Sequence, residues 1–243
     1  MLFVPYFIGA RTRDGARLAP ADVIEPALPE GSPQERLGVL YRELAGRVRE
    51  SEDARVQAGD CMASIGVVSG LQARGVDPAV VWLDAHGDFN TWETTPSGFL
   101  GGMPLAMLAG LGEQTIVEAA GQRPVASDRL LLVGARDLDP GEEANLERAR
   151  VRQVAVDELT PAALPEGALY LHLDTDVVRL EEMPAVNYPA PGGPGADAVR
   201  GALEVVLATG RVAAVSYTGW DPNLPGAELS AATARRMLQG LLF

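Results

Sequence analysis

Two acidic motifs, each placed directly after an apolar run, most constrain what this chain can fold into. The first run, residues 79–83, leads into Asp-x-His-x-Asp, and the second, residues 169–173, leads into Asp-x-Asp. Apolar runs of this length predict buried strands, in which alternate side chains share a face. We therefore expect the acidic side chains to point the same way from the carboxyl ends of two strands. The motif residues are Asp84, His86, Asp88, Asp174 and Asp176.

Four carboxylates brought together in this way require a compensating charge. Without a cation they would repel one another and their pKa values would rise, whereas two divalent cations would balance them. The simpler interpretation is that each Asp caps a helix after a strand. That interpretation explains one Asp per strand end, but it does not explain Asp-x-His-x-Asp together with Asp-x-Asp. We therefore interpret the five residues as metal ligands.

Apolar runs of strand length alternate with stretches of helical apolar spacing along most of the chain. Strands are expected over residues 2–9, 56–58, 79–84, 129–133, 151–156, 168–174 and 211–216. Helices are expected over residues 20–28, 37–48, 62–73, 103–111, 142–150, 196–208 and 227–242, and loops over 9–18, 94–102 and 181–195. The alternation predicts an α/β fold with a mostly parallel sheet covered by helices on both faces. With no linker evident, residues 1–243 are expected to form a single domain.

Charge and composition exclude several classes of function. The net charge of −13 argues against binding to nucleic acid or to an anionic membrane surface. A single cysteine, Cys61, excludes an internal disulfide, and the absence of lysine excludes a catalytic lysine. The N-terminus lacks the features of a signal peptide and no apolar run could span a bilayer, so we expect a cytoplasmic protein. His172, apart from His86 the only histidine, is interpreted as a hydrogen-bonded core residue.

Longer motifs surround these residues. Residues 81–108 contain Trp-x-Asp-Ala-His-x-Asp-x-Asn-Thr followed by Thr-x-Ser-Gly-x-Leu-x-Gly-x-Pro-Leu, and shorter matches recur at 134–142, 173–176, 189–193 and 215–224. In these motifs the chain resembles the arginase/agmatinase (ureohydrolase) family. The resemblance implies a three-layer α/β sandwich and usually two Mn²⁺ ions. It also implies a metal-bridging hydroxide that attacks a guanidinium carbon and releases urea.

The resemblance assigns a role to each motif residue. It implies that Asp84 and Asp174 bridge the two ions. Asp88 would complete the coordination of one ion and act as the catalytic residue that hydrogen-bonds the bridging hydroxide. His86 and Asp176 would complete the coordination of the other ion.

Three further residues match substrate-binding positions of the family. Asn90 and Ser97 match positions that bind the carboxylate end of the substrate in arginases. Asp139 matches an acidic residue near the substrate's amino group. Because Asp139 directly precedes Pro140, it is equally interpreted as a helix cap.

The chain departs from the family pattern among the metal ligands. Ala58-Gly59-Asp60-Cys61 stands where the family has Gly-Gly-Asp-His. A cysteine thiolate binds Zn²⁺ or Fe²⁺ more readily than Mn²⁺, so we expect Cys61 to be a ligand and allow either metal. Cys61 could instead be a small buried residue that fills a helix start. Arg179 replaces an aspartate that supports the metal ligands in the family.

The substrate-binding loops depart as well. Gly101 replaces a histidine that aids proton transfer in arginase, and Phe99 replaces an asparagine. Gly219 replaces the glutamate that pairs with the guanidinium, which removes a charge-assisted contact with a planar cation. The resemblance therefore implies a less cationic, more apolar pocket than arginine needs.

Three hypotheses follow. The first is a metal-dependent hydrolase of a guanidino or amidino C–N bond in a small molecule, with two Mn²⁺ per chain, in a homo-oligomer like those of the family. The second is a single-zinc, deacetylase-like amide hydrolase. The third is a catalytically degenerate family member that is not an enzyme. Retention of both aspartate motifs favours the first.

Overall fold

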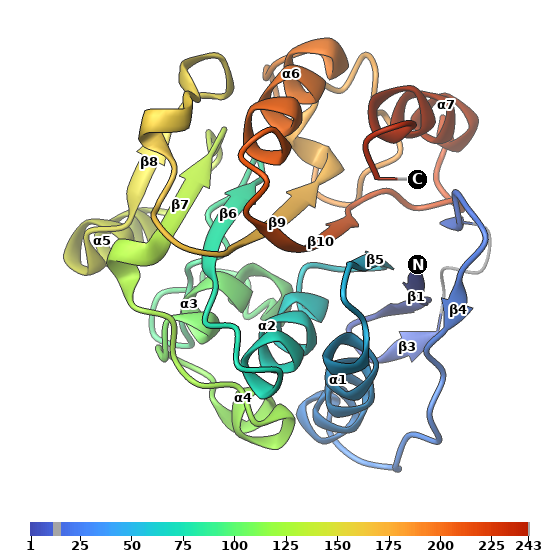
Figure 1. The fold of residues 1–243 in the computed structure, drawn as a ribbon, viewed down its shortest axis with the longest axis vertical. Helices are drawn as coiled ribbons and strands as arrows, with labels where there is room; N and C mark the ends of the chain where they lie inside the picture. The colour runs from blue at the N-terminus through green and yellow to red at the C-terminus, as the bar shows by residue number, and fades with distance from the viewer. Residues whose placement is uncertain (12–15, 243) are drawn as a thin grey trace.

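The computed structural model describes residues 1–11 and 16–242. At its centre lies an eight-stranded sheet with the strand order β4-β1-β5-β10-β9-β6-β7-β8, and all neighbouring strands are parallel (Figure 1). Its strands are β1 (Leu2–Val4), β4 (Asp22–Val23), β5 (Ala54–Ala58), β6 (Ala79–Leu83), β7 (Leu130–Val133), β8 (Arg152–Val154), β9 (Leu169–Asp174) and β10 (Val212–Thr218). A separate antiparallel pair is formed by β2 (Tyr6–Phe7) and β3 (Ala10–Arg11).

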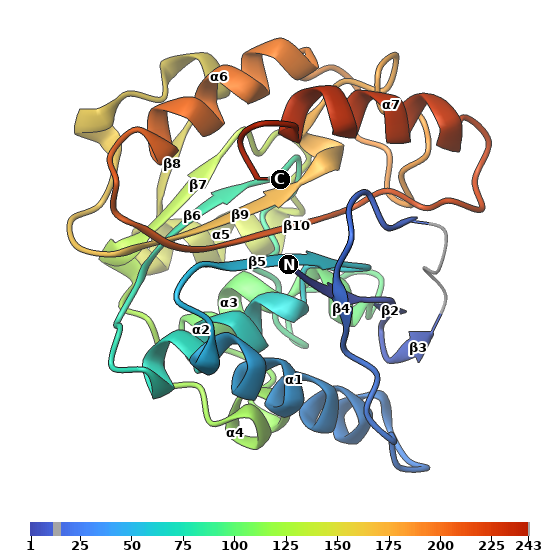
Figure 2. The ribbon, with the colours of Figure 1, turned by 45° about the vertical axis from the view of Figure 1, so that its right-hand side comes forward.

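Helices cover both faces of this sheet, which gives three layers (Figure 2). Helices α1 to α5 contribute to the core on one face, and α6 and α7 to the core on the other. The helices are α1 (Pro33–Glu50), α2 (Ala63–Ala73), α3 (Pro104–Leu108), α4 (Thr115–Ala120), α5 (Pro140–Ala149), α6 (Ala196–Leu207) and α7 (Ala227–Leu238). Short 3₁₀ helices cover Leu100–Gly102, Ser127–Arg129, Val156–Glu158, Pro161–Ala163 and Thr175–Val177. The expected α/β sandwich with a mostly parallel sheet is confirmed.

Alternate residues of the central strands enter the two cores. In β9, Tyr170 packs on the side of α1 to α5, whereas Leu171 and Leu173 pack on the side of α6 and α7. Because both faces are buried, β6 and β7 are entirely apolar, and β9 is apolar before Asp174 except for His172.

Strand register brings the two aspartate motifs side by side at the carboxyl ends of the strands. Leu83 at the end of β6 pairs with Leu173 in β9, and Asp174 at the end of β9 pairs with Thr218 in β10. Strand β10 in turn pairs with β5. The loops that follow these four strands therefore start side by side, as expected for a ligand site in a parallel sheet.

Two local expectations were wrong, and one helix was missed. Residues 20–28 do not form a helix; Asp22–Val23 forms edge strand β4, and Pro26 would interrupt a helix here. The expected strand over 2–9 divides at Pro5, which has no N–H for a sheet hydrogen bond. Helix α4 was not expected.

Three sequence expectations remain: the loop over 9–18, the absence of a membrane span and the single domain. The loop expected over 9–18 contains β3, and its residues 12–15 lie outside the described part. Among residues 1–11 and 16–242, no helix is long and apolar enough to cross a membrane. Strands from both ends of the chain share one sheet, and the single-domain organisation stays a prediction.

Candidate metal centre

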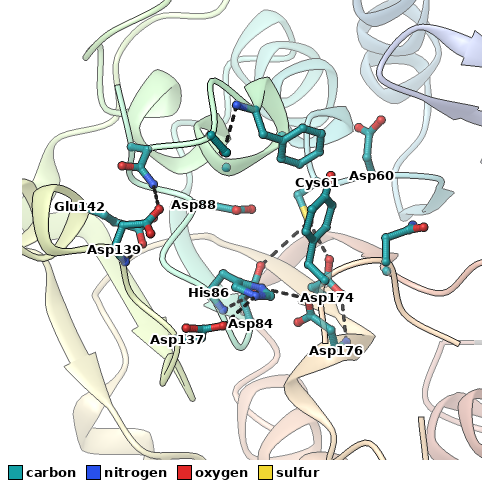
Figure 3. Close-up of a pocket in the computed structure, with 18 of the residues that line it drawn as sticks. Asp60, Cys61, Asp84, His86, Asp88, Asp137, Asp139, Glu142, Asp174 and Asp176 are labelled. Atoms are coloured by element: carbon teal, nitrogen blue, oxygen red, sulfur yellow. Dashed lines mark hydrogen bonds and ion pairs between the residues drawn. The ribbon is translucent and has the colours of Figure 1, made fainter. Parts of the chain in front are cut away.

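A cavity of about 370 Å³ opens where β5, β6, β9 and β10 end (Figure 3). All six predicted ligands line it, together with the three predicted substrate-binding residues. The six are Cys61, Asp84, His86, Asp88, Asp174 and Asp176. The structure thus brings together side chains that lie as far apart as 115 positions in the sequence.

Asp84, His86 and Asp176 form the first group. The Nδ1 atom of His86 lies 3.0 Å from Oδ2 of Asp176 and 3.4 Å from Oδ1 of Asp84. The backbone N–H of His86 donates to Oδ1 of Asp84 at 2.8 Å, and the N–H of Ala85 donates to Oδ1 of Asp176 at 3.2 Å. One ligand atom from each of the three residues lies within 4.8 Å of the others, so one cation could contact all three.

Cys61 and Asp174 form the second group. The thiol of Cys61 lies 2.9 Å from Oδ2 of Asp174 and 4.0 Å from Oδ2 of Asp84. The hydroxyl of Thr218 donates to the same Asp174 oxygen at 3.2 Å. Burial raises the pKa of the Cys61 thiol well above its usual value, and the charge of Asp174 raises it further. A divalent cation would offset both effects and stabilise the thiolate.

Asp88 reaches the cavity by an unexpected backbone path. Strand β6 ends at Leu83, and Asp88 has a φ of 49°, so the motif does not continue as an extended strand. Its Oδ2 atom is buried and has no hydrogen-bond partner among the described residues. Burial, followed by the charge of Asp84, raises the pKa of Asp88 well above its usual value. A buried carboxylate oxygen without a partner is costly, and a cation in the cavity would satisfy it.

Burial also raises the pKa values of two other predicted acidic ligands. Burial and then the charge of Asp176 raise the pKa of Asp174 to about 7. Burial and then the charge of Asp84 raise the pKa of Asp176 to about 6. Burial alone would lower the pKa of His86, but hydrogen bonds with Asp176 and Asp84 outweigh it and raise this pKa to about 12. This donor set, with one orphaned oxygen, fits divalent cations.

The three predicted substrate-binding residues line the same cavity. The amide of Asn90 donates to Oδ2 of Asp139 at 2.9 Å, and Thr94 donates to Asn90 at 3.0 Å. Asp139 occupies the N-cap position of α5 and also lines the cavity, so both interpretations of this residue fit the structure. Ser97 is exposed, and its hydroxyl accepts from the N–H of Phe99 at 3.2 Å.

Glu142 is a cavity residue that our sequence analysis missed. Its Oε1 atom accepts from the N–H of Phe89 at 2.7 Å, next to Asp88, and its Oε2 atom accepts from the N–H of Asp139 at 3.3 Å. Burial raises the pKa of Glu142 to about 7. The Asp-Pro-x-Glu pattern of a capping box at 139–142 could have revealed its position.

Aromatic side chains form the outer wall, and two of them were not predicted. The Phe99 ring lies 6.2 Å from the Phe7 ring and 4.7 Å from the Tyr188 ring, measured between centroids. A Cβ atom at Gly101 would overlap the Phe99 ring. A Cβ atom at Gly219, whose φ is 104°, would overlap the carboxylate of Asp174. The departures at 99, 101 and 219 are therefore built into the shape of this cavity.

The model of the arginase family matches residues 31–243, which is most of the chain. The chain belongs to the arginase family. Arginase of Bacillus subtilis is 27% identical over 216 residues, which cover 84% of this chain and 73% of that protein. A crystal structure of arginase from Bacillus subtilis superimposes with a TM-score of 0.83 and 26% identity, covering 99% of this chain and 96% of the other.

Other relatives of this arginase-family chain carry different names. N(omega)-hydroxy-L-arginine amidinohydrolase of Streptomyces lavendulae is 33% identical over 175 residues, covering 70% of this chain and 62% of that protein. Formimidoylglutamase from Bacillus subtilis superimposes with a TM-score of 0.74 over 98% of this chain and 83% of the other. At 16% identity this likeness shows the fold alone.

Proposed function

We propose that this arginase-family protein is a metal-dependent hydrolase that cleaves a C–N bond of a guanidino or amidino group. The observation that supports this proposal most is the convergence of six ligand side chains on one cavity, with the Oδ2 atom of Asp88 buried and unpartnered among the described residues. Bound divalent cations would supply a water whose pKa is lowered enough to attack near neutral pH.

Each residue has a distinct place in the proposed centre. Asp84 of the first group and Asp174 of the second would contact both ions. Asp88 and Cys61 would complete one ion, and His86 and Asp176 the other. Mn²⁺ is the metal implied by the family. The ion that Cys61 contacts could instead be Zn²⁺ or Fe²⁺, because a thiolate prefers softer metals.

Asp88 is the residue that we expect to handle the proton. Asp88 lines the cavity, so one oxygen of its carboxylate could contact an ion while the other accepts a hydrogen bond from the attacking water and orients it. From this position the carboxylate could take up the proton of that water and return it to the departing amine.

The cavity walls suggest the class of substrate. Asn90 and Asp139 form one polar wall, while Phe7, Phe99 and Tyr188 form an aromatic one. Gly219 provides no carboxylate for the planar cation. We therefore propose a guanidino or amidino compound whose other end is apolar or aromatic, rather than L-arginine.

The test is a screen for release of urea and ammonia by the purified, Mn²⁺-loaded protein. We expect turnover of an arylalkyl guanidine to exceed that of L-arginine. Asp88→Asn should lower this turnover by at least about a hundredfold. Asp128→Asn, at an exposed carboxylate before β7, is the matched control and should leave it unchanged. Failure to cleave any guanidine or amidine with two ions bound would contradict the proposal.

Metal content separates this function from the two alternatives. The cluster of Asp84, His86 and Asp176 would alone suffice for a single-zinc amide hydrolase. The partnerless Asp88 oxygen and the position of Cys61 favour a second ion. Elemental analysis should give about two ions per chain; one zinc would support the deacetylase-like alternative, and none a degenerate member. We also propose a homo-oligomer, which light scattering tests.

A further inference from the structure

A third group of potential ligands joins two residues that line the cavity, Cys61 and Asp84, to His172, which lies beside Ser64 of α2. One ligand atom from each of Cys61, Asp84 and His172 lies within 4.8 Å of the others, and all three side chains are buried. We propose that these residues form a soft-metal position, so that the ion on the Cys61 side is Zn²⁺ held by thiolate, imidazole and carboxylate. This inference refines the proposed centre, but its test does not depend on turnover.

His172 provides the independent observation. Its Nδ1 atom lies 2.7 Å from the Ser216 hydroxyl and 3.4 Å from each of the hydroxyls of Ser64 and Tyr170. Its Nε2 atom is buried and has no hydrogen-bond partner among residues 1–11 and 16–242. The large majority of buried side-chain polar atoms have a hydrogen-bond partner, so the unpartnered Nε2 calls for an explanation. When Nδ1–H donates to Ser216, Nε2 presents its lone pair, which is the state that binds a metal.

The neighbours of His172 hold it in the orientation that a ligand needs. His172 in β9 pairs with Trp82 in β6, and their ring centroids lie 3.8 Å apart. The indole N–H of Trp82 donates to Oδ2 of Asp84 at 3.1 Å. Trp82 thus contacts both His172 and Asp84. A hydrogen bond donated by Nδ1–H of His172 to the Ser216 hydroxyl is the kind of contact that fixes the tautomer of a metal-ligating histidine.

The distances are compatible with one shared ion. Zinc ligands at about 2.0–2.3 Å from the metal lie roughly 3.3–3.7 Å from one another. The ligand atoms of Cys61, Asp84 and His172 lie within 4.8 Å of one another, so side-chain shifts of about 1 Å would bring them to these spacings. A thiolate and an imidazole prefer Zn²⁺ to Mn²⁺, whereas Asp84, His86 and Asp176 offer a harder set. The centre would then hold two chemically different ions.

The decisive experiment uses the fact that the chain has only two histidines. In an untagged His86→Asn protein loaded with Zn²⁺, X-ray absorption at the zinc edge should show one sulfur at about 2.3 Å. The same zinc should show imidazole scattering, which in this variant can come only from His172. Sulfur without imidazole, or no sulfur, would overturn the proposal.

Substitution of His172 gives a second measurement in an intact His86 background. His172→Asn keeps an N–H donor near Ser216 but removes Nε2, so zinc affinity on the Cys61 side should fall at least about tenfold. In the Co²⁺-loaded protein, the thiolate-to-cobalt absorption band should weaken in parallel. Tyr170→Phe removes a neighbour of Nδ1 and leaves Nε2, so it should bind like the wild type. If His172→Asn has the same zinc affinity and the same cobalt absorption band as the wild type, His172 is only a core residue.

These readouts separate the inference from the proposed function. If the zinc is bound by sulfur and imidazole but the protein cleaves no guanidine, the soft-metal position is supported and the proposed hydrolase function is contradicted. If the protein cleaves a guanidine with two Mn²⁺ ions bound and no sulfur ligand, the hydrolase function is supported and the soft-metal position is contradicted.

Discussion

At the scale of single residues, the centre depends on positions whose backbone, pairing or packing is locally costly. Asp88 combines a positive φ with a buried oxygen that has no partner in the described part of the chain. Gly219 leaves no space between its backbone and Asp174. Such costs are typical of functional sites, where ligand geometry outweighs local stability.

Gly219→Ala should disturb the metal centre directly. Its Cβ atom would overlap the Asp174 carboxylate, so that ligand must move and bound metal should fall from about two ions toward one. Elemental analysis after gel filtration measures this. Gly192→Ala is the control, because Gly192 also has a positive φ, 76°, but no described atom within 4 Å of an added Cβ. It should cost about 1 kcal/mol of stability and retain both ions. Equal metal loss in both variants would contradict the steric explanation.

Metal affinity should fall as the pH is lowered through the range in which the ligands gain protons. Burial raises the pKa of Asp174 to about 7 and that of Asp176 to about 6, from a usual value of 3.8. In the metal-free protein these shifts favour folding below about pH 4, and this contribution is lost as the pH rises through about 7. Metal binding must displace the protons and therefore has the opposite trend.

Titration calorimetry in buffers of different ionisation enthalpy measures the protons released. We expect proton release on metal binding at about pH 6 and little release from these two carboxyls at about pH 8. Proton release that is the same at both values would contradict the assignment of Asp174 and Asp176 as ligands.

At the scale of elements, the central strands could be predicted because each combines an apolar run with a polar motif at its end. Residues 79–83 and 169–174 illustrate this. The edge strand β4 could not be predicted, because Asp22–Val23 is too short and too exposed to show an alternation of apolar and polar residues. The meeting of Cys61 with His172 was also hidden, because it depends on the order in which β5, β10, β9 and β6 lie in the sheet.

The contact between α1 and α2 should tolerate no side chain at Gly70. A Cβ atom there would lie 2.6 Å from the carbonyl oxygen of Ala45 and 2.6 Å from Cβ of Val48. Gly70→Ala should therefore lower the free energy of unfolding by about 1–3 kcal/mol, measured by urea denaturation. Gly46→Ala, in the interior of α1 with no described atom near its added Cβ, should raise it by about 0.5–1 kcal/mol. Stabilisation by both changes would show that the helices can separate without cost.

At the scale of the whole molecule, the fold was predictable and the cavity walls were only partly so. Alternating strands and helices suffice to place both aspartate motifs at one edge of a parallel sheet. Phe7 and Tyr188 reach the same cavity from a short hairpin and a long loop, and no local pattern links those segments to it. The cytoplasmic location and the homo-oligomer stay predictions.

Removal of metal should destabilise the entire molecule, because ligands from β5, β6 and β9 would be joined by the same ions. At a metal concentration about a hundredfold above Kd, binding contributes about 2.7 kcal/mol. For a chain of this length, chelation should then lower the Tm by about 5–10 °C, measured by scanning calorimetry. Asp176→Asn should show a smaller shift. A Tm that does not change with chelator in a metal-loaded sample would contradict the proposed centre.

The place of β10 in the sheet has a consequence for biosynthesis. Strand β10 lies between β5 and β9, although both are made before it (Figure 1). Until residue 218 leaves the ribosome, the growing chain therefore has two half-sheets with open edges, one carrying Cys61 and the other Asp84, His86 and Asp176. Insertion of the last strand joins the halves. A nascent chain cannot assemble the full set of ligands, and metal acquisition by the complete centre must follow translation.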